Sequence, residues 1–248
     1  MLWYNVSGDL FMDKIDYLKK YYKGNLEDAI KRLETGEPVQ YIVGNVDFYG
    51  YELDVNKNVL IPRRETEELV EEVIKRSQEF VNPTIIDIGT GSGAIAISLS
   101  KELNKHVYAS DISSEALGVA KQNSIKNNAN ITFLEGDMLK PFVERNIKVD
   151  IIVSNPPYIK EDEEIEDIVK NNEPHLALYA RNNGLEFYES ILKVAKLVLN
   201  DKFLIAFEIG CEQANDIKEL AKKYLGDVKV EIKKDLSSKD RMLFVYNY

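Results

Sequence analysis

The sequence predicts an α/β fold, in which a mostly parallel sheet is covered by helices on both faces. Two observations lead to this prediction. From residue 84 onward, short β-branched runs alternate with amphipathic segments of helical period, which is typical of parallel strands joined by crossover helices. A glycine-rich segment, residues 89–93, follows the first of these runs and precedes a helical segment, as ligand-binding loops of such sheets do. The 248 residues allow one such domain and a small accessory one.

Residues 1–44 are predicted to form that small accessory domain, made of two short helices. Asp9 is expected to cap the first helix and Asn25 the second. Gly36 and Pro38 are expected to stop the second helix. The apolar positions at helical spacing are Phe11, Ile15, Leu18, Tyr22, Leu26, Ala29, Ile30 and Leu33.

Residues 45–62 are predicted to be a β-hairpin linker, because two short strand-like runs flank Gly50. Residues 63–248 are predicted to form the large domain, which is expected to begin with a helix after Pro62. Its further strands are expected at 84–89, 106–112, 131–137, from 149 onward, at 202–210, 228–235 and 241–248, and its further helices at 91–103, 113–128, 184–200 and 212–225. The last two strands are five residues apart (Leu236–Asp240), which is too short for a crossover, so they should be antiparallel.

Composition limits the class of protein. Apolar residues make up 44% and charged residues 30%, an ordinary balance for a globular protein. The net charge of -10 disfavours a nucleic-acid partner, since gripping a phosphate backbone takes basic patches. The single cysteine, Cys211, excludes a disulfide framework and is expected to be buried. His106 and His175 have no partner at ligand spacing, so no metal site is predicted. Without a membrane span or signal peptide in the pattern, we expect a cytoplasmic protein, with a monomer favoured.

The segment from Asp87 to Ala94, DIGTGSGA, is the first candidate for a ligand site. Glycine lets the backbone take positive φ and approach a ligand closely. Gly89, Gly91 and Ala94 also satisfy a dinucleotide fingerprint, and Asp111 follows about 20 residues later, where it suits a ribose diol. The loop alone therefore predicts a nucleotide-like ligand and leaves open which one.

Two further features favour S-adenosylmethionine over a dinucleotide. Asp87 places a carboxylate just before the glycines, where it would repel a pyrophosphate but attract the cationic end of a methionine. Asp137 and Met138 end the next strand but one, where a carboxylate can accept from an adenine amine and a thioether can pack on its ring. With Asp111, these acids form a line along the binding edge of the predicted sheet.

The segment Asn155-Pro156-Pro157-Tyr158 is the most informative motif. The prolines stop the strand and fix the backbone, and Pro156 keeps Asn155 extended. The Asn155 side-chain oxygen and the Pro156 carbonyl can accept both hydrogens of a planar NH2 group. Such a nitrogen is a poor nucleophile, so two rigid acceptors would orient it and stabilise the positive charge that develops during attack. Tyr158 can cover the flat face of the substrate.

Several segments together resemble one known family. IPRRETEELVE, DIGTGSGAIAISLS, IVSNPPYI, EPHLALYARNNGLEFY, EIG and KDLSSKDR occur in this order between residues 40 and 241. They are similar to the motif series of the release-factor glutamine methyltransferases, the HemK/PrmC family. The NPPY element alone is shared with DNA adenine-N6 methyltransferases, whereas the segments around IPR-ETE and EP-x-x-AL are more specific. The chain departs from the family at Arg64, where proline is common, at Met138, where some members carry an aromatic residue, and in its shorter helical domain.

The resemblance implies a class I, Rossmann-like methyltransferase fold with a seven-stranded sheet. It implies methyl transfer from S-adenosylmethionine to the side-chain N5 of the glutamine in the Gly-Gly-Gln motif of peptide-chain release factors, with the N-terminal domain helping to dock that partner. By the match, the cofactor-binding residues would be Gly89, Thr90, Gly91, Ser92, Gly93, Asp111, Met138 and Asn155. The residues that hold the glutamine amide would be Asn155, Pro156, Pro157 and Tyr158, with Asn155, Pro156 and Tyr158 catalytic.

Other readings stay open at this point. A nucleic-acid adenine-N6 methyltransferase would face the same planar NH2 group and differ in the surface around it. Two other functions are a ligand-binding module without turnover and a dehydrogenase that uses the glycine segment. Neither of them explains the presence of the NPPY motif. Glu208, at the end of the strand that precedes Cys211, fits either a wall of the site or a solvated position. The acidic run 161–167 fits a solvated loop, or a lid whose charge favours a basic protein partner.

Overall fold

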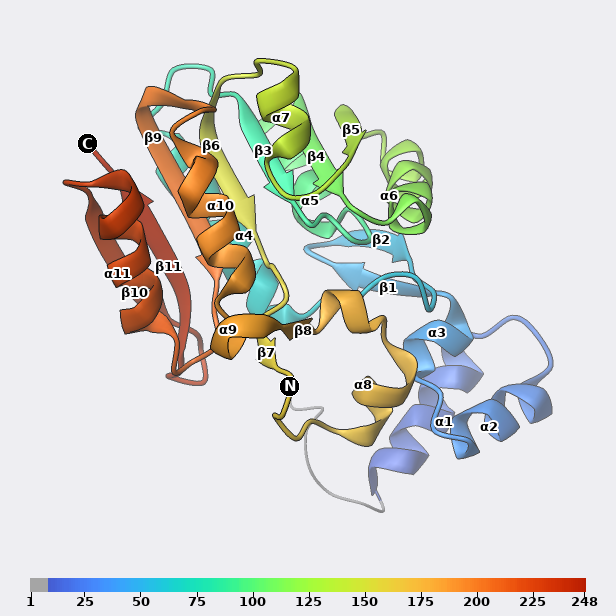
Figure 1. The fold of residues 1–248 in the computed structure, drawn as a ribbon. Helices are drawn as coiled ribbons and strands as arrows, with labels where there is room; N and C mark the ends of the chain where they lie inside the picture. Colours follow the sequence, from blue (N-terminus) through green and yellow to red (C-terminus); the bar gives the residue numbers. More distant parts are fainter. Residues whose placement is uncertain (1–8) are drawn as a thin grey trace.

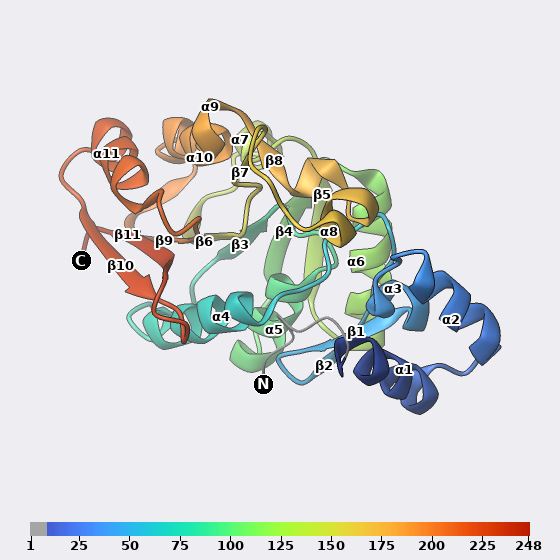
Figure 2. The ribbon, with the colours of Figure 1, turned by 90° about the horizontal axis from the view of Figure 1, so that it is seen from below.

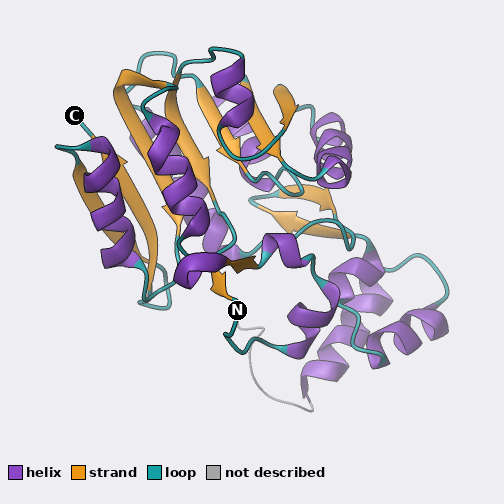
Figure 3. Cartoon of the chain, in the orientation of Figure 1, coloured by secondary structure: helices purple, strands orange, loops and turns teal. Residues whose placement is uncertain are grey.

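A computed structural model describes residues 9–248, with side chains from residue 12 onward. Within that range a seven-stranded sheet has the order β10-β11-β9-β6-β3-β4-β5 (Figures 1 and 3). Its strands are β3 (Ile85–Ile88), β4 (Val107–Asp111), β5 (Ile131–Glu135), β6 (Val149–Ser154), β9 (Leu199–Glu208), β10 (Lys229–Lys234) and β11 (Asp240–Tyr246). The strands from β9 to β5 pair in parallel, and β11 is antiparallel to both of its neighbours. The predicted α/β class and the antiparallel closing pair are confirmed.

Helices cover both faces of this sheet (Figure 2). They are α4 (Arg64–Ser77), α5 (Ala94–Leu103), α6 (Ser114–Lys126), α7 (Lys140–Glu144), α10 (Glu186–Ala195) and α11 (Ala214–Leu225). One apolar core lies between the sheet and α7, α10 and α11, and a second lies between the sheet and α4 and α5. α6 lies beside α5 against β4 and β5. Burial on both faces explains why the strands are continuous apolar runs.

The N-terminal part contains α1 (Asp9–Tyr21), α2 (Leu26–Glu34), α3 (Val39–Val43) and the hairpin of β1 (Asn45–Phe48) and β2 (Tyr51–Asp54). Asn25 caps α2 as predicted, since its Oδ1 accepts from the N–H groups of Glu27 and Asp28. The predicted capping of the first helix by Asp9 remains a prediction, because the Asp9 side chain lies outside the described residues. The prediction of two helices missed α3, because Pro38, expected only as a stop, is the residue from which the next helix starts.

The chain between β6 and α10 leaves the carboxyl edge of the sheet and returns to it (Figure 1). It contains β7 (Ile159–Lys160), α8 (Asp167–Asn172), the 3-10 turn η1 (His175–Ala177), β8 (Tyr179–Ala180) and α9 (Arg181–Gly184). β7 and β8 pair with each other, so the two ends of this excursion meet. Residues 161–166 are mostly exposed and have no regular structure, as expected of a solvated acidic loop.

Three local predictions are wrong. The helix expected at 184–200 ends at Ala195, because the backbone at Val198 and Leu199 turns to pair with Val149 at the start of β6. The strand expected at 202–210 therefore begins earlier, at residue 199, and ends at Glu208. Cys211 is exposed rather than buried, since it lies in the turn after β9 and no longer faces the core.

Residues 9–248 contain neither a helix that could span a membrane nor a metal-binding cluster. None of the helices there has both the length and the apolar character needed to cross a bilayer. The same residues hold no group of three or more His, Cys, Asp and Glu side chains that could bind a metal ion.

Candidate functional site

The register of the sheet places the two sequence motifs next to each other. Ile88 at the end of β3 pairs with Ser110 of β4 on one side and with Ser154 of β6 on the other. The Ser154 hydroxyl also donates to the Ile88 carbonyl over 2.7 Å. The residues that follow these three positions are Gly89, Asp111 and Asn155. The glycine loop (residues 89–93) and the Asn-Pro corner (residues 155–158) therefore leave the same edge of the sheet side by side.

The glycine loop has the backbone that its composition predicts. Gly89, Gly91 and Gly93 have φ values of +69°, +55° and +87°, a region that side chains rarely adopt. A Cβ atom built on Gly89 or Gly91 meets nothing within 4 Å, so space is open beside this part of the loop. Ser92 is buried, and its carbonyl accepts from Asn123 of α6 over 2.9 Å. The loop is thus firmly held while one side of it stays accessible to a ligand.

Asp111 fixes the glycine loop from the neighbouring strand. One of its oxygens accepts from the Gly91 N–H and the other from the Ser113 N–H, both over 2.9 Å. Burial raises the pKa of the Asp111 carboxyl, and these backbone hydrogen bonds oppose that shift. A carboxylate held in this way has remaining lone pairs that can accept from a ligand's hydroxyl groups.

Asp87 lies directly beneath the loop and is fully buried. Its Oδ2 accepts from the Thr90 hydroxyl over 2.6 Å. Its Oδ1 has no hydrogen-bond partner among the described residues. Burial raises the pKa of Asp87 to about 7, and the Thr90 hydrogen bond and the backbone N–H of Ala96 oppose that rise. A buried carboxylate oxygen without a donor is costly, so Asp87 is suited to receive a cationic or hydrogen-bonding group of a ligand.

Asp137 and Met138 lie two and three residues beyond the end of β5, in the turn before α7. Asp137 is exposed, and Met138 packs against the first core with a φ of +44°. The Met138 carbonyl accepts from Ser110 of β4 over 3.3 Å. The two residues therefore lie on the same edge as the glycine loop, beyond Asp111.

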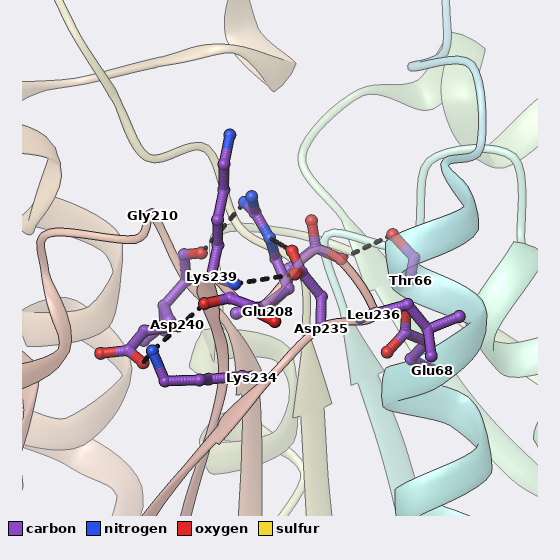
Figure 4. Close-up of polar contacts among 12 residues, drawn as sticks. Thr66, Glu68, Glu208, Gly210, Lys234, Asp235, Leu236, Lys239 and Asp240 are labelled. Carbon is purple, nitrogen blue, oxygen red and sulfur yellow. Dashed lines mark hydrogen bonds and ion pairs between the residues drawn. The ribbon is translucent and has the colours of Figure 1, made fainter. Parts of the chain in front are cut away.

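The Asn-Pro corner is held by side chains from distant parts of the chain. The Asn155 Nδ2 donates to the hydroxyl of Thr66, in the first turn of α4, over 3.2 Å. The Thr66 hydroxyl donates to Glu208 Oε2, at the end of β9, over 2.6 Å (Figure 4). Thr66 is 5% exposed and Glu208 is 2% exposed. Glu208 is therefore a buried wall of the site and not a solvated residue.

Tyr158 closes the other side of the corner. Its hydroxyl lies 3.5 Å from Glu208 Oε1 and 3.4 Å from a nitrogen of Arg241, which also pairs with the buried Asp235. Burial raises the pKa of Tyr158, so its hydroxyl stays protonated at neutral pH. The ring is consequently held at both ends, by the core below and by polar partners at the hydroxyl.

The backbone of the corner is clamped by Gln213, just before α11. Its Nε2 donates to the carbonyls of Tyr158 and Asn183 over 2.9 and 3.2 Å, and its Oε1 accepts from the Gly210 N–H over 3.0 Å. Gly184, at a φ of +82°, passes so close that a Cβ atom there would lie 2.2 Å from the Tyr158 carbonyl oxygen. The clamp requires a side-chain amide at one position and the absence of any side chain at the other.

A second ionic contact joins the segment before α4 to the excursion after β6. Arg63 pairs with Glu173 over 2.5 Å, and Glu173 also accepts from the Ile61 N–H over 3.0 Å. Glu173 is 5% exposed. Asn172 donates to the Gly36 carbonyl over 3.0 Å, which ties the same segment to the end of the N-terminal helices.

Comparison with known proteins identifies the family. A Bacillus subtilis "Release factor glutamine methyltransferase" is 45% identical over 217 residues, covering 85% of this chain and 75% of its own length. A protein of the same name from Bacillus anthracis is 40% identical over 241 residues, covering 95% of this chain and 85% of its own. The chain belongs to the release factor glutamine methyltransferase family. Accordingly, the family model "Methyltransferase small domain" matches residues 65–177.

Solved structures confirm the fold expected of this family. A methyltransferase from Pyrococcus furiosus aligns with a TM-score of 0.59 at 21% identity, over 80% of this chain and 89% of its own. A 16S rRNA methyltransferase of Thermus thermophilus, solved with AdoMet and guanosine, aligns with a TM-score of 0.59 at 15% identity, over 82% of this chain and 50% of its own. The class I methyltransferase fold with its seven-stranded sheet is confirmed.

Within this family member, sequence reasoning missed side chains that complete the site. Thr66, Glu173, Gln213, Asp235 and Arg241 each hold a part of the corner or of the segments beside it. All but Gln213 fall within three of the segments that carry the family resemblance, namely IPRRETEELVE, EPHLALYARNNGLEFY and KDLSSKDR. Those segments were therefore a signal for the region of the site, although not for the contacts within it.

Proposed function

We propose that this protein transfers a methyl group from S-adenosylmethionine to the side-chain N5 of the glutamine in the Gly-Gly-Gln motif of peptide-chain release factors. The observation that carries the proposal is the pairing of Ile88 with Ser154, which puts the glycine loop and the Asn-Pro corner at adjoining positions. A methyl donor on the first and a carboxamide on the second would face each other across that edge. Membership of the release factor glutamine methyltransferase family supports the choice of substrate.

The residues at the glycine loop fit S-adenosylmethionine. The partnerless Oδ1 of Asp87 suits the donor's ammonium group, directly or through a water molecule, and a nearby cation would favour the ionised carboxylate. Asp111 suits the ribose hydroxyls, and Asp137 and Met138 suit the adenine amine and ring. The open space beside Gly89 and Gly91 admits the donor's backbone. When bound, S-adenosylmethionine supplies an activated methyl group on a sulfonium centre.

The Asn-Pro corner prepares the acceptor. Asn155 presents its Nδ2 to Thr66, so its Oδ1 is left to accept one hydrogen of the substrate amide. The Pro156 carbonyl accepts the other, and Tyr158 covers the flat face of the amide. The two acceptors orient a delocalised nitrogen and stabilise the positive charge that develops as it attacks. Positioning therefore supplies much of the rate, and no side-chain nucleophile is needed.

The domain arrangement that we propose assigns docking of the release factor to residues 1–44, with residues 45–62 as a linker and residues 63–248 as the catalytic domain. The hydrogen bond from Asn172 to Gly36 supports it, since it joins the helical part to the segment that follows the corner. We further propose that the protein acts as a monomer in the cytoplasm and does not bind nucleic acid directly. The net charge of -10 supports the last point.

The direct test is to incubate the purified protein with S-adenosylmethionine and a full-length release factor, followed by mass spectrometry of the peptide that contains Gly-Gly-Gln. We expect one added methyl group on the glutamine. A release factor with that glutamine changed to glutamate should stay unmodified. An adenine-containing oligonucleotide is the matched competitor, and methylation of the oligonucleotide without methylation of the release factor would contradict the proposal.

A further inference from the structure

The side-chain amide of Asn155 has two ends of similar shape and opposite hydrogen-bonding character. Its oxygen accepts, whereas its NH2 group donates. The substrate glutamine also presents an NH2 group. If the Asn155 amide turned over by 180°, two donors would face each other and the acceptor that orients the reacting nitrogen would be lost. The proposed reaction therefore needs a device that keeps this amide in one orientation.

The chain from Asn155 through Thr66 to Glu208 has the property that such a device requires. The Thr66 hydroxyl has a single hydrogen, which it donates to Glu208 Oε2 over 2.6 Å. Only its lone pairs then remain for Asn155, which must present its NH2 group and does so over 3.2 Å. An ionised carboxylate can only accept, so Glu208 sets the direction of both hydrogen bonds.

We infer that Thr66 and Glu208 are positioning residues for the methyl transfer, a role that rests on the proposed function: their hydrogen-bonded relay holds the Asn155 amide with its oxygen toward the substrate glutamine. The three residues come from separate elements, α4, the end of β6 and the end of β9. Both members of the relay are buried, which keeps water from replacing either bond. Neither needs to touch the substrate.

The protonation state of Glu208 decides whether the relay keeps its direction. Burial raises the pKa of Glu208 to about 7, opposed by the Thr66 hydrogen bond and by Arg241. The titratable groups that face it from the surrounding elements are Arg63, Glu65, Tyr158, Tyr188 and Arg241. Once protonated, Glu208 can donate to Thr66, whose own hydrogen is then free to point at Asn155. The orientation of the amide is lost as the pH falls through about 7.

The first arm of the test compares Thr66→Val with Thr66→Ser in the full-length protein. Valine keeps the shape of threonine without its hydroxyl, whereas serine keeps the hydroxyl. We expect Thr66→Val to lower kcat on a release factor about 10-fold to 100-fold, the size of effect that misplacement of a reacting group produces. KM for the release factor and Kd for S-adenosylmethionine should change little. The thermal midpoint should fall in Thr66→Val, because the buried Glu208 Oε2 loses its donor, so kcat is measured well below that midpoint. Thr66→Ser should restore kcat, and a wild-type kcat in Thr66→Val would overturn the inference.

The second arm measures kcat against pH at saturating donor for the wild type and for Glu208→Gln. In the wild type, kcat should rise with pH through about 7 as Glu208 loses its proton. In Glu208→Gln that rise should vanish. Its persistence would overturn the inference, and this arm decides alone if Thr66→Val does not fold. A wild-type protein that leaves the release-factor glutamine unmethylated refutes the proposed function, whereas normal turnover in both variants refutes the relay only.

Discussion

The glycine loop and the Asn-Pro corner leave adjacent strands, yet they are held in different ways. The loop is fixed mainly by its own surroundings in the sequence: Thr90 bonds to Asp87 three residues away, and Gly91 bonds to Asp111 twenty residues away. The corner depends on partners from far along the chain, since Asn155 and Thr66 are 89 residues apart and Tyr158 and Gln213 are 55 apart. The partners of the glycine loop lie at most 31 residues away in the sequence, whereas the corner depends on contacts that only the complete fold brings together.

The variant with the largest expected effect, Asn155→Ala, distinguishes the role of the corner from that of the glycine loop most directly. Asn155→Ala removes the oriented acceptor and should lower kcat about 100-fold to 1000-fold. The affinity for S-adenosylmethionine should fall much less, because the glycine loop and its carboxylates remain. Single-turnover methylation of a release factor, together with a calorimetric Kd for the donor, checks both parts. Turnover close to the wild-type value would remove Asn155 from the mechanism.

Asp111→Ala should mainly weaken the binding of S-adenosylmethionine and leave kcat almost unchanged, and its effect should be smaller than that of Asn155→Ala. It takes away the acceptor of the Gly91 and Ser113 N–H groups and the partner proposed for the ribose hydroxyls. Hydrogen bonds to a charged group contribute about 1.5–3 kcal/mol, which corresponds to about a 10-fold to 100-fold weaker Kd for S-adenosylmethionine. At saturating donor, kcat should remain near the wild-type value. A large drop in kcat with an unchanged Kd would mean that the two regions are not separable in this way.

Gln213→Leu gives the smallest effect of the three and tests the long-range support of the corner. Leucine fills the space without bonding to the Tyr158 and Asn183 carbonyls. We expect the free energy of unfolding to fall by about 1 kcal/mol, the size of a typical hydrogen-bond contribution. Turnover should fall several-fold at most, and donor affinity should not change. Chemical denaturation and steady-state kinetics on the same preparation measure these quantities, and a weakened donor Kd would contradict the comparison.

The same contrast explains what the sequence could predict. The local sequence pattern of a strand, a turn and a helix start identifies Gly89, Gly91 and Asp111, because it depends only on residues that are near each other in the chain. Asn155 and the prolines are visible because proline constrains its neighbours along the chain. Thr66 and Gln213 carry no such signal, since an ordinary threonine in a helix and a glutamine in a turn acquire their partners only through the tertiary fold. Glu208 was predicted at the correct edge of the sheet. Its burial depends on tertiary contacts, since Thr66 of α4 contacts its carboxylate and β11 pairs beside it.

Boundary errors have the same origin. The apolar pattern around residues 196–200 fits either a helix or a strand, and the pairing of Leu199 with Val149 decides for the strand. The short helix α3 was missed because five residues hold too little periodic signal, while its burial among the N-terminal helices stabilises it. In each case a contact distant in the sequence outweighs the local preference.

The close passage of Gly184 beneath the Tyr158 carbonyl limits how this protein can evolve. A hydrogen atom fits there, and even a methyl group would collide with the backbone of the corner and require a strained φ. The collision would displace the segment that orients the substrate. A stabilising substitution elsewhere in the chain could restore folding, but it would not restore the position of that segment. Position 184 should therefore be closed to substitution under selection for activity, although no side chain there takes part in the chemistry.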